Sequence, residues 1–543
     1  MTCYKKLIIP IMSLSLLMGC SKKYLDEDSR GVLTADLLYS SQAGFQNGLN
    51  GLYDEVRRYR SGDLYGQIND IMNMQAVIGV DDAYGNWRDP TVDVFNLWGI
   101  INNPSFGHYD NVWSWLYETI NEANTIINRA DEATFIWTPG AKNNIVAQAR
   151  LIRAWCYRHL TSLWGDIPLT LVESTGANIQ TNWQRTPKTQ VWASMRDDLL
   201  FAEQNLPVTS TDDAQLIQGV ASHYLAELYL AMGRPDSAKI EATKVTTNPA
   251  YQLVTARYGV NLSAPGTPFT DMFLDGNSLR SQGNTEALWT FQLGLNINGG
   301  EGYNIMRRYW ANRYYSLTVK GTDGKSTSPI QVVAVAGGRG IGRLSPTRWM
   351  LNLFKGVQDD RGGNFSWHYY YLMNTTPPKG YAIGDTVRLD STGIEKLSNP
   401  NWPSTSKWDW TSPTNVLIDP QYNDQFLVRS AETYLLLAEA DYDLGDMQGA
   451  ADAINPLRTR AHATPITAAD ITIDYILDER ARELFSEEDR RYVLLRTGRW
   501  LARVQADNKI AAPNVQARDS LLPIPQAVID ANRTSPMTQN PGY

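Results

Sequence analysis

Aromatic side chains stand beside charged and amide side chains in three stretches that lack a helical apolar period: 81–88, 303–315 and 402–410. Sugars have apolar C–H faces and polar edges, so a surface that binds them needs exposed rings flanked by hydrogen-bonding groups. We therefore predict that Trp87 and Trp310 belong to a ligand-binding surface, although rings that only pack these loops together have the same composition. Five further residues are candidates for the same site: Tyr84, Arg88, Trp98, Tyr303 and Tyr309.

Catalytic and metal-binding signatures are weak in this sequence. The five histidines are isolated from one another, and no cluster has metal-ligand spacing. Gly-x-Ser-x-Gly, Walker and dinucleotide-binding motifs and a complete EF-hand are missing from the sequence. We predict a protein that is not an enzyme and has no cofactor. A structural Ca²⁺ ion stays open, and so does a carboxylate pair of glycoside hydrolase type among the 57 acidic residues.

Charge and cysteine content narrow the class of protein further. The net charge of −8 argues against nucleic acid as a partner, because phosphate binding needs a basic face. The three cysteines are Cys3, Cys20 and Cys156. Cys156 falls on the apolar face of a predicted helix and is expected to be a buried free thiol. Because we expect the segment with Cys3 to be removed, no disulfide pair is left and Cys20 needs another role.

The first twenty residues have the pattern of a secretory signal. Two lysines precede an apolar run, 7–18, which is too short to span a bilayer. The run leads into Leu17-Met18-Gly19-Cys20, which resembles the lipobox of bacterial lipoproteins. That resemblance implies a signal peptide over 1–19, acylation of Cys20 and a polar tether over 20–30. Acyl chains would hold the protein at a membrane, because each buried methylene contributes about 0.8 kcal/mol.

Helical periodicity dominates both ends of the remaining chain. Apolar residues recur at steps of three and four, and Gly165 is a stop signal for one of these helices. The predicted helical segments are 112–130, 141–163, 191–206, 217–232, 426–460 and 473–500. Within the last segment, helical spacing predicts ion pairs of Arg480 with Glu483 and of Asp478 with Arg482.

One helix–glycine–helix unit occurs twice. In each copy an Ala-Glu pair is followed by a glycine and then an alanine at the same spacings, and glycine supplies the left-handed turn between two closely packed helices. The copies are Ala226-Glu227, Gly233 and Ala238, and Ala438-Glu439, Gly445 and Ala450. This unit resembles the tetratricopeptide helix pair, and the distance between the copies predicts an interrupted solenoid.

The middle of the chain, about 251–422, is rich in glycine, proline, asparagine and aromatic residues, and runs such as Gln331–Val335 have strand character. We predict a mainly α protein. Tetratricopeptide-like helix pairs form its scaffold, and long ordered loops with a few short strands carry the ligand site. The predicted organisation is a single domain over 31–543, with a helical part at 31–250, a loop-rich ligand-binding insert at 251–425 and a helical part at 426–543.

Seven segments along the chain form an ordered set of motifs. The segments are Trp113-x3-Tyr117-x2-Ile120-x3-Asn124, Leu163-Trp164-Gly165-Asp166-Ile167-Pro168-Leu169, Arg429-Ser430-Ala431-Glu432, Asn455-x2-Arg458-x-Arg460, Glu479-Arg480-x2-Glu483-Leu484, Leu522-Pro523-Ile524-Pro525 and Gln539-Asn540-Pro541-Gly542-Tyr543. In this order they resemble the SusD/RagB family of nutrient-binding lipoproteins. The most specific motifs lie in the second half of the chain, and the match extends to the last residues. Departures occur at Val493 and Glu488, where the family often has Asp and Gly.

The resemblance implies a SusD-like fold and a role in nutrient uptake. It implies a lipid-anchored protein of the outer membrane that faces the cell exterior, captures a glycan and delivers it to a SusC-like TonB-dependent transporter. Two other functions stay open on the residues alone: a glycoside hydrolase at the cell surface, and a helical-repeat adaptor that binds only proteins. The nutrient itself is not identified by the sequence.

Overall fold

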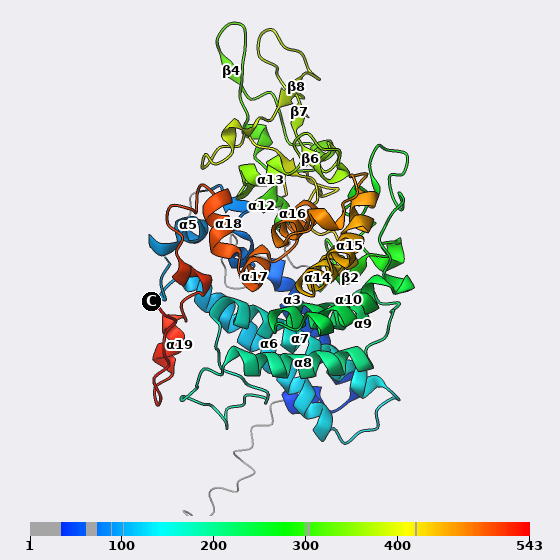
Figure 1. Ribbon diagram of the computed structural model, residues 1–543, viewed down its shortest axis with the longest axis vertical. Coiled ribbons are helices and arrows are strands. Elements are labelled where there is room, and N and C mark those ends of the chain that lie inside the picture. Colours follow the sequence, from blue (N-terminus) through cyan, green and yellow to red (C-terminus); the bar gives the residue numbers. More distant parts are fainter. Residues whose placement is uncertain are drawn as a thin grey trace, which may run out of the picture.

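The computed structural model describes residues 34–60, 73–87, 90–100, 102–297, 299–300, 305–418 and 421–543. The predicted signal peptide, the predicted acylation site Cys20 and the predicted tether lie outside this part of the chain. Helices dominate the molecule and strands are short, which confirms the mainly α prediction (Figure 1). Across the described segments, no helix combines the length and apolar character needed to cross a bilayer.

The helices are α2 (Ala35–Leu38), α3 (Gln42–Arg57), α4 (Met74–Val77), α5 (Pro90–Leu97), α6 (Gly107–Glu132), α7 (Ala141–Trp164), α8 (Lys188–Asn205), α9 (Gln218–Ala231), α10 (Pro235–Thr246), α11 (Pro268–Asp271), α12 (Met306–Trp310), α13 (Arg348–Asn352), α14 (Ser430–Asp443), α15 (Met447–Arg460), α16 (Ile473–Leu484), α17 (Arg490–Arg496), α18 (Trp500–Asp507) and α19 (Gln526–Ala531). The strands are β1 (Ala83–Gly85), β2 (Ala287–Phe291), β3 (Val319–Lys320), β4 (Ser326–Thr327), β5 (Leu344–Pro346), β6 (Trp367–His368), β7 (Tyr370–Leu372), β8 (Thr386–Arg388), β9 (Ser404–Thr405) and β10 (Gln425–Arg429). They pair antiparallel as β1–β5, β2–β10, β3–β4, β6–β9 and β7–β8.

The helical scaffold is continuous in space although the two repeat copies are far apart in the sequence. Helix α10 of the first copy packs against α14 of the second (Figure 1). Lys239 of α10 forms an ion pair with Asp441 of α14 at 2.6 Å, and the Tyr434 hydroxyl donates to the Thr246 carbonyl at 3.0 Å. The expected interruption therefore exists only along the chain, because the insert leaves the scaffold and returns beside its starting point.

Both repeat turns have the backbone conformation that their glycines predict. The φ angle is +68° at Gly233 and +78° at Gly445, in the region that residues with a Cβ rarely adopt. A third glycine, Gly165, ends α7 with φ at +75°, and its N–H donates to the Thr161 carbonyl at 3.1 Å. These turns set the antiparallel approach of the helices that follow.

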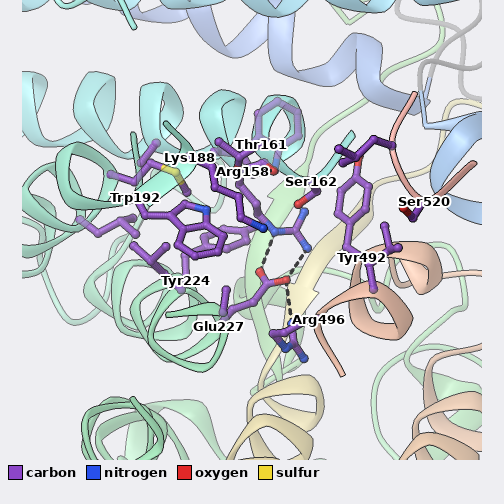
Figure 2. A pocket seen from close by; sticks show the side chains of 18 residues that line it. Arg158, Thr161, Ser162, Lys188, Trp192, Tyr224, Glu227, Tyr492, Arg496 and Ser520 are labelled. Atoms are coloured by element: carbon purple, nitrogen blue, oxygen red, sulfur yellow. Dashed lines mark hydrogen bonds and ion pairs between the residues drawn. The ribbon is translucent and has the colours of Figure 1, made fainter. Parts of the chain in front are cut away.

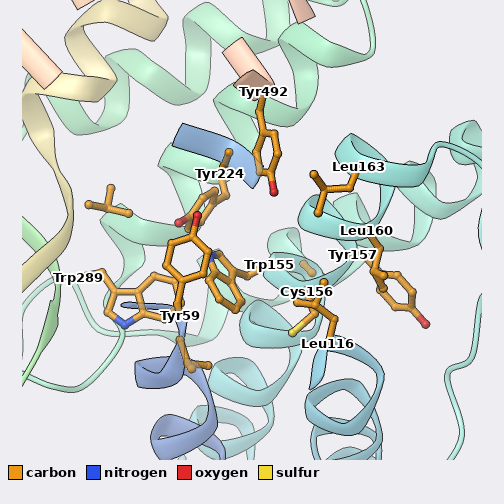
Figure 3. Packing of buried hydrophobic residues seen from close by; sticks show 14 of the residues in the cluster. Tyr59, Leu116, Trp155, Cys156, Tyr157, Leu160, Leu163, Tyr224, Trp289 and Tyr492 are labelled. Carbon is orange, nitrogen blue, oxygen red and sulfur yellow. The ribbon is translucent and has the colours of Figure 1, made fainter. Parts of the chain in front are cut away.

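The core lies where α7 meets the neighbouring helices and β2 (Figure 3). Trp155 packs edge-to-face against Tyr59 and Trp289, with ring centroids 5.3 and 5.8 Å apart. Cys156 is fully buried beside this aromatic cluster, as predicted, and burial raises the pKa of its thiol well above the ordinary value. A thiol in these surroundings stays protonated and unreactive.

Three predicted elements differ from the structure. Segment 426–460 begins with β10, which pairs with β2, and only then becomes helical. The helix expected over 473–500 is broken after α16, where Ser486 has φ at +67°. The predicted strand at Gln331–Val335 is wrong, because that segment pairs with no other strand and its end enters a 3₁₀ turn, Ala334–Ala336.

Buried ion pairs join the insert to the C-terminal helices. Glu483 of α16 is fully buried and accepts hydrogen bonds from Arg361 of the insert, from Arg429 at the end of β10 and from Arg460 of α15. Its predicted partner Arg480 instead pairs with carboxylates of other segments. Buried charges need several partners, and an exposed pair on one helix cannot supply them.

The other predicted pair in α16 is also wrong. Asp478 accepts from Arg503 of α18 at 2.6 Å, whereas Arg482 pairs with Glu479 at 2.6 Å. The C-terminal tail is fixed to the body, because the Asn540 side chain donates to the carbonyls of Leu522 and Trp164 at 2.7 and 3.1 Å.

Candidate ligand-binding site

Four of the predicted ligand-binding aromatics belong to the core. Tyr84, Trp98 and Tyr309 are fully buried, and Trp310 is 1% exposed. The edge of Trp310 meets the ring of Phe485, with centroids 5.1 Å apart. Neighbouring side chains cover these rings, so their prediction as exposed stacking plates is wrong. The loops fold back onto the helical scaffold and bury their aromatic residues there.

Among the predicted rings that the structure describes, Trp87 keeps an accessible surface. Its side chain is half-buried, and the guanidinium of Arg313 lies 4.9 Å from its ring centroid. Arg88 and Tyr303 lie outside the described residues. In the third predicted stretch, Trp410 is half-buried and donates its indole N–H to Asp275 at 3.0 Å. Trp87 therefore stays a candidate, but its cation–π partner already covers one face.

A polar cleft of ≈ 630 Å³ opens between the start of the scaffold and the insert. Side chains from α3, α7, the loop before α9, the segment after β2 and the residue before β10 line it. The polar cleft is defined by Gln46, Asn50, Tyr53, Asp54, Arg57, Asn144, Gln148, Asp212, Gln215, Gln292 and Asp424. Amide and carboxylate side chains and one tyrosine share this lining with the apolar side chains of Phe291, Leu293 and Ile297.

Helix α3 supplies one wall because its polar residues recur with helical spacing. Gln46, Asn50, Tyr53 and Arg57 are separated by steps of four, three and four, so they share a face. Arg57 ties this wall to the insert by donating to the carbonyls of Gln292 and Gly299 at 3.0 and 2.7 Å. The cleft therefore spans two parts of the chain that are far apart in sequence.

A chain of hydrogen bonds forms the opposite side of the cleft. The Tyr53 hydroxyl donates to the Gln148 carbonyl oxygen at 2.5 Å and accepts from the Leu216 N–H at 2.9 Å. Gln148 donates in turn to the Asn144 side chain at 2.7 Å, which also accepts from Gln215 at 3.2 Å. This network fixes the orientation of the amides, so their remaining donors and acceptors are held in place for a ligand.

The carboxyl group of Asp424 in the polar cleft has a raised pKa. Burial raises its pKa to about 6, and the nearby carboxylates of Asp275 and Asp213 act in the same direction. The Leu293 N–H donates to Asp424 at 3.0 Å and opposes the shift. Near neutral pH the group is an acceptor for ligand hydroxyls, and below about pH 6 it also becomes a donor.

The sequence contains a signal for this cleft that composition of the loops does not reveal. The polar residues that α3 contributes to the cleft recur with helical spacing in the sequence, and so do the amides of Asn144 and Gln148 near the start of α7. Within the described segments no three His, Cys, Asp or Glu side chains are grouped to hold a metal ion. The arrangement offers fixed hydrogen-bond donors and acceptors to a hydroxyl-rich ligand.

Comparison with known proteins identifies the family to which this fold belongs. Residues 285–543 match the family described as the SusD family, and residues 23–230 match one described as starch-binding and associating with the outer membrane. The chain belongs to the SusD family. The resemblance predicted from the sequence motifs is thereby confirmed, and the long loop-rich insert is part of a SusD-like fold.

Individual relatives of this SusD-family chain are distant but extend over its whole length. It is 24% identical to SusD-like protein P2 of Formosa agariphila over 554 residues, with 98% of each chain covered. A solved laminarin-binding SusD-like protein is 18% identical, with a TM-score of 0.67, over 92% of this chain and 99% of the other. Surface glycan-binding protein A from Bacteroides fluxus is also 18% identical, with a TM-score of 0.68, over 93% and 100%. The two structures show the shared fold.

Proposed function

We propose that this SusD-family chain binds a glycan at the cell surface and delivers it to a SusC-like TonB-dependent transporter for uptake. The observation that carries the binding proposal is the polar cleft, in which oriented amides and carboxylates offer hydrogen bonds to the edges of sugar rings. Two structures with the same fold are described as binding laminarin and as a surface glycan-binding protein, which supports glycan as the ligand class.

The proposed location at the outer membrane rests on the sequence and on the family. The lipobox-like Cys20 would carry the acyl anchor, and the matching family is described as associating with the outer membrane. Replacing Cys20 by Ala should move the protein from the outer-membrane fraction to the soluble fraction and remove the acyl mass from the mature chain. A Cys20→Ala protein that stays in the membrane fraction would contradict lipid anchoring.

Binding can be tested on the mature full-length protein with a panel of polysaccharides that begins with laminarin, by affinity electrophoresis and calorimetry. Asn50→Ala combined with Gln46→Ala removes two exposed amides from the cleft wall. The matched control is Asn47→Ala, which lies on the same helix at an exposed position outside the cleft lining. The double variant should bind the active glycan at least about tenfold more weakly, because two hydrogen bonds of about 1 kcal/mol each are lost.

Trp87 is proposed as a second contact for the glycan, through stacking on its ring. Arg88 and Tyr303 stay candidates for the same contact from the sequence. Trp87→Ala should weaken glycan binding by roughly fivefold to tenfold, as loss of one ring contact does. Unchanged calorimetric affinity, together with an unchanged melting temperature, would remove Trp87 from the site.

Transfer to a transporter and lack of catalysis are part of the proposal and have their own tests. The tagged chain should recover a TonB-dependent barrel protein when it is purified from outer membranes in mild detergent. Incubation with any glycan that it binds should release no reducing sugar. Steady release of reducing sugar would favour a glycoside hydrolase. If the protein binds no glycan of a broad panel but still co-purifies with other proteins, that result would favour an adaptor.

A further inference from the structure

A second cavity, with ≈ 430 Å³ of space, lies inside the helical scaffold, between α7, α8, α9 and α17 (Figure 2). We call it the helical pocket. None of its lining residues belongs to the polar cleft. Its size is that of a site for a small molecule or the end of a chain.

Aromatic rings stand on two sides of the helical pocket. Figure 2 shows Trp192 of α8 and Tyr224 of α9 on one side of Arg158, and Tyr492 of α17 on the other. Trp192 is half-buried, so part of its ring is free to meet a ligand, whereas Tyr224 and Tyr492 are 6% and 3% exposed. The Arg158 guanidinium lies 5.5 and 5.1 Å from the ring centroids of Tyr224 and Tyr492, so Trp192 is the ring of this pocket that can stack on the C–H face of a sugar.

The floor of the pocket consists of charged groups held in fixed positions. Arg158 donates to both carboxylate oxygens of Glu227, at 2.6 and 2.9 Å, and Arg496 lies 3.3 Å from the same carboxylate. Asp489 and Glu439 pair with the outer sides of the two arginines at 2.6 and 2.7 Å. These two guanidinium groups and three carboxylates together carry one net negative charge, so the floor offers oriented hydrogen-bonding groups and any attraction for an anion must come from the rim.

The rim differs from the floor because its cation, Lys188, is exposed, although the Asp166 carboxylate accepts from the backbone N–H of the same residue at 2.8 Å. Lys188, at the first turn of α8, is exposed, and its ammonium lies 5.1 Å from the ring centroid of Trp192. The hydroxyl-bearing residues Ser162 and Ser520 line the pocket as well (Figure 2). An anionic group on a ligand that stacks on Trp192 would therefore meet the Lys188 ammonium.

The floor also closes the pocket against a continuous polymer. Trp155 and Met195 line it and are 2% and 4% exposed, so the pocket has no second opening through the core on that side. A closed floor of this kind suits the end of a chain, which need not thread through the pocket. The Trp192 ring, paired polar groups below and a cation at the mouth together match one terminal sugar unit that bears a carboxylate.

We propose that the helical pocket is a second saccharide site that takes a terminal uronic acid unit, with its ring against Trp192 and its carboxylate at Lys188. This inference rests on the proposed glycan-binding function and adds the chemical class of sugar to it. The polar cleft would hold the length of a chain and the helical pocket its charged end.

The test uses the mature full-length protein with galacturonate and its neutral counterpart galactose, by saturation-transfer NMR and calorimetry. Galacturonate should bind about fivefold more tightly, as an ion pair of about 1 kcal/mol produces. Lys188→Gln should abolish this preference, and Lys379→Gln, which removes an exposed lysine elsewhere, should keep it. Trp192→Ala should weaken both sugars by about tenfold, and Trp192→Phe should restore most of the loss.

Three results would overturn the proposal: no galacturonate binding, equal affinities for the two sugars, or a preference that survives Lys188→Gln. Unchanged binding in Trp192→Ala with an unchanged melting temperature would overturn it as well. Failure of the proposed function is a separate result, because the cleft variant Asn50→Ala combined with Gln46→Ala changes only the polar cleft and shares no residue with the helical pocket. Galacturonate binding that responds to Trp192 without any polysaccharide binding would support the pocket and reject the cleft.

Discussion

Replacing Glu483 by Gln tests how far the buried ion pairs stabilise the fold. The Glu483 carboxylate is fully buried and accepts from Arg429, Arg460 and Arg361, the last at 3.0 Å. Burial alone would raise its pKa, but the three guanidinium groups hold the pKa well below its usual range. The substitution keeps the shape of the side chain and removes the charge that the three arginines share.

The expected loss of unfolding free energy is about 3 to 5 kcal/mol, the range for breaking a buried pair by removing one partner. Three hydrogen bonds to charged groups at roughly 1.5 to 3 kcal/mol each set an upper bound, and the amide oxygen of Gln retains part of it. Because the pKa of Glu483 is depressed, its stabilisation is present above the unfolded pKa near about 4.3 and is lost as pH falls further. The gap between the two proteins should therefore shrink below about pH 4.

Urea unfolding followed by tryptophan fluorescence and by far-UV circular dichroism measures this difference, with coincidence of the two transitions as the condition for reading a free energy. The matched control is Glu132→Gln at the exposed end of α6, which should stay within about 0.5 kcal/mol of the parent. A loss below about 1 kcal/mol for Glu483→Gln with unchanged secondary structure would refute the reasoning. Desolvation of the charges would then offset their attraction.

Three further predictions concern single residues. Asp424→Asn should stabilise the protein at about pH 8 and have no effect near about pH 3, because a folded-state pKa raised to about 6 makes ionisation of Asp424 costly above that pH; pH-dependent melting curves measure this. Gly445→Ala should cost about 1 kcal/mol through its φ of +78°, whereas Gly51→Ala inside α3 should be neutral or stabilising, by thermal unfolding of both. Cys156 should react with a disulfide reagent only after unfolding, and rapid labelling of the native protein would contradict its burial.

The helices and the repeat could be predicted from the sequence because their signals are local. A residue's neighbours at steps of three and four determine whether a helix has an apolar face, and α7 follows this pattern up to Gly165. The glycines of the repeat act through their own φ angles, at Gly233 and Gly445. The family motifs are also local strings of residues, so the resemblance to SusD/RagB proteins could be found before the fold was known.

Local signals of this kind could not distinguish aromatic residues that are exposed for ligand binding from aromatic residues of the core. Trp310 and Trp87 lie in stretches of the same composition, yet one is buried against Phe485 and the other is half-buried under Arg313. Exposure depends on which distant segment covers a loop, and the sequence of the loop does not contain that information. Among the residues that the structure describes, the rings with the largest exposure are instead Phe365, Tyr370 and Tyr381 of the insert.

By itself the sequence determined the helical scaffold, its glycine turns, the buried thiol of Cys156 and membership of the SusD family. Only the tertiary structure decided that Glu483 meets three arginines from three segments, and that α3 and Asp424 line one cleft. The physical reason is the separation along the chain of the residues that each feature depends on. Backbone conformation and helix periodicity depend on residues a few positions apart, whereas ion pairing and ligand sites depend on side chains that the folded chain brings together.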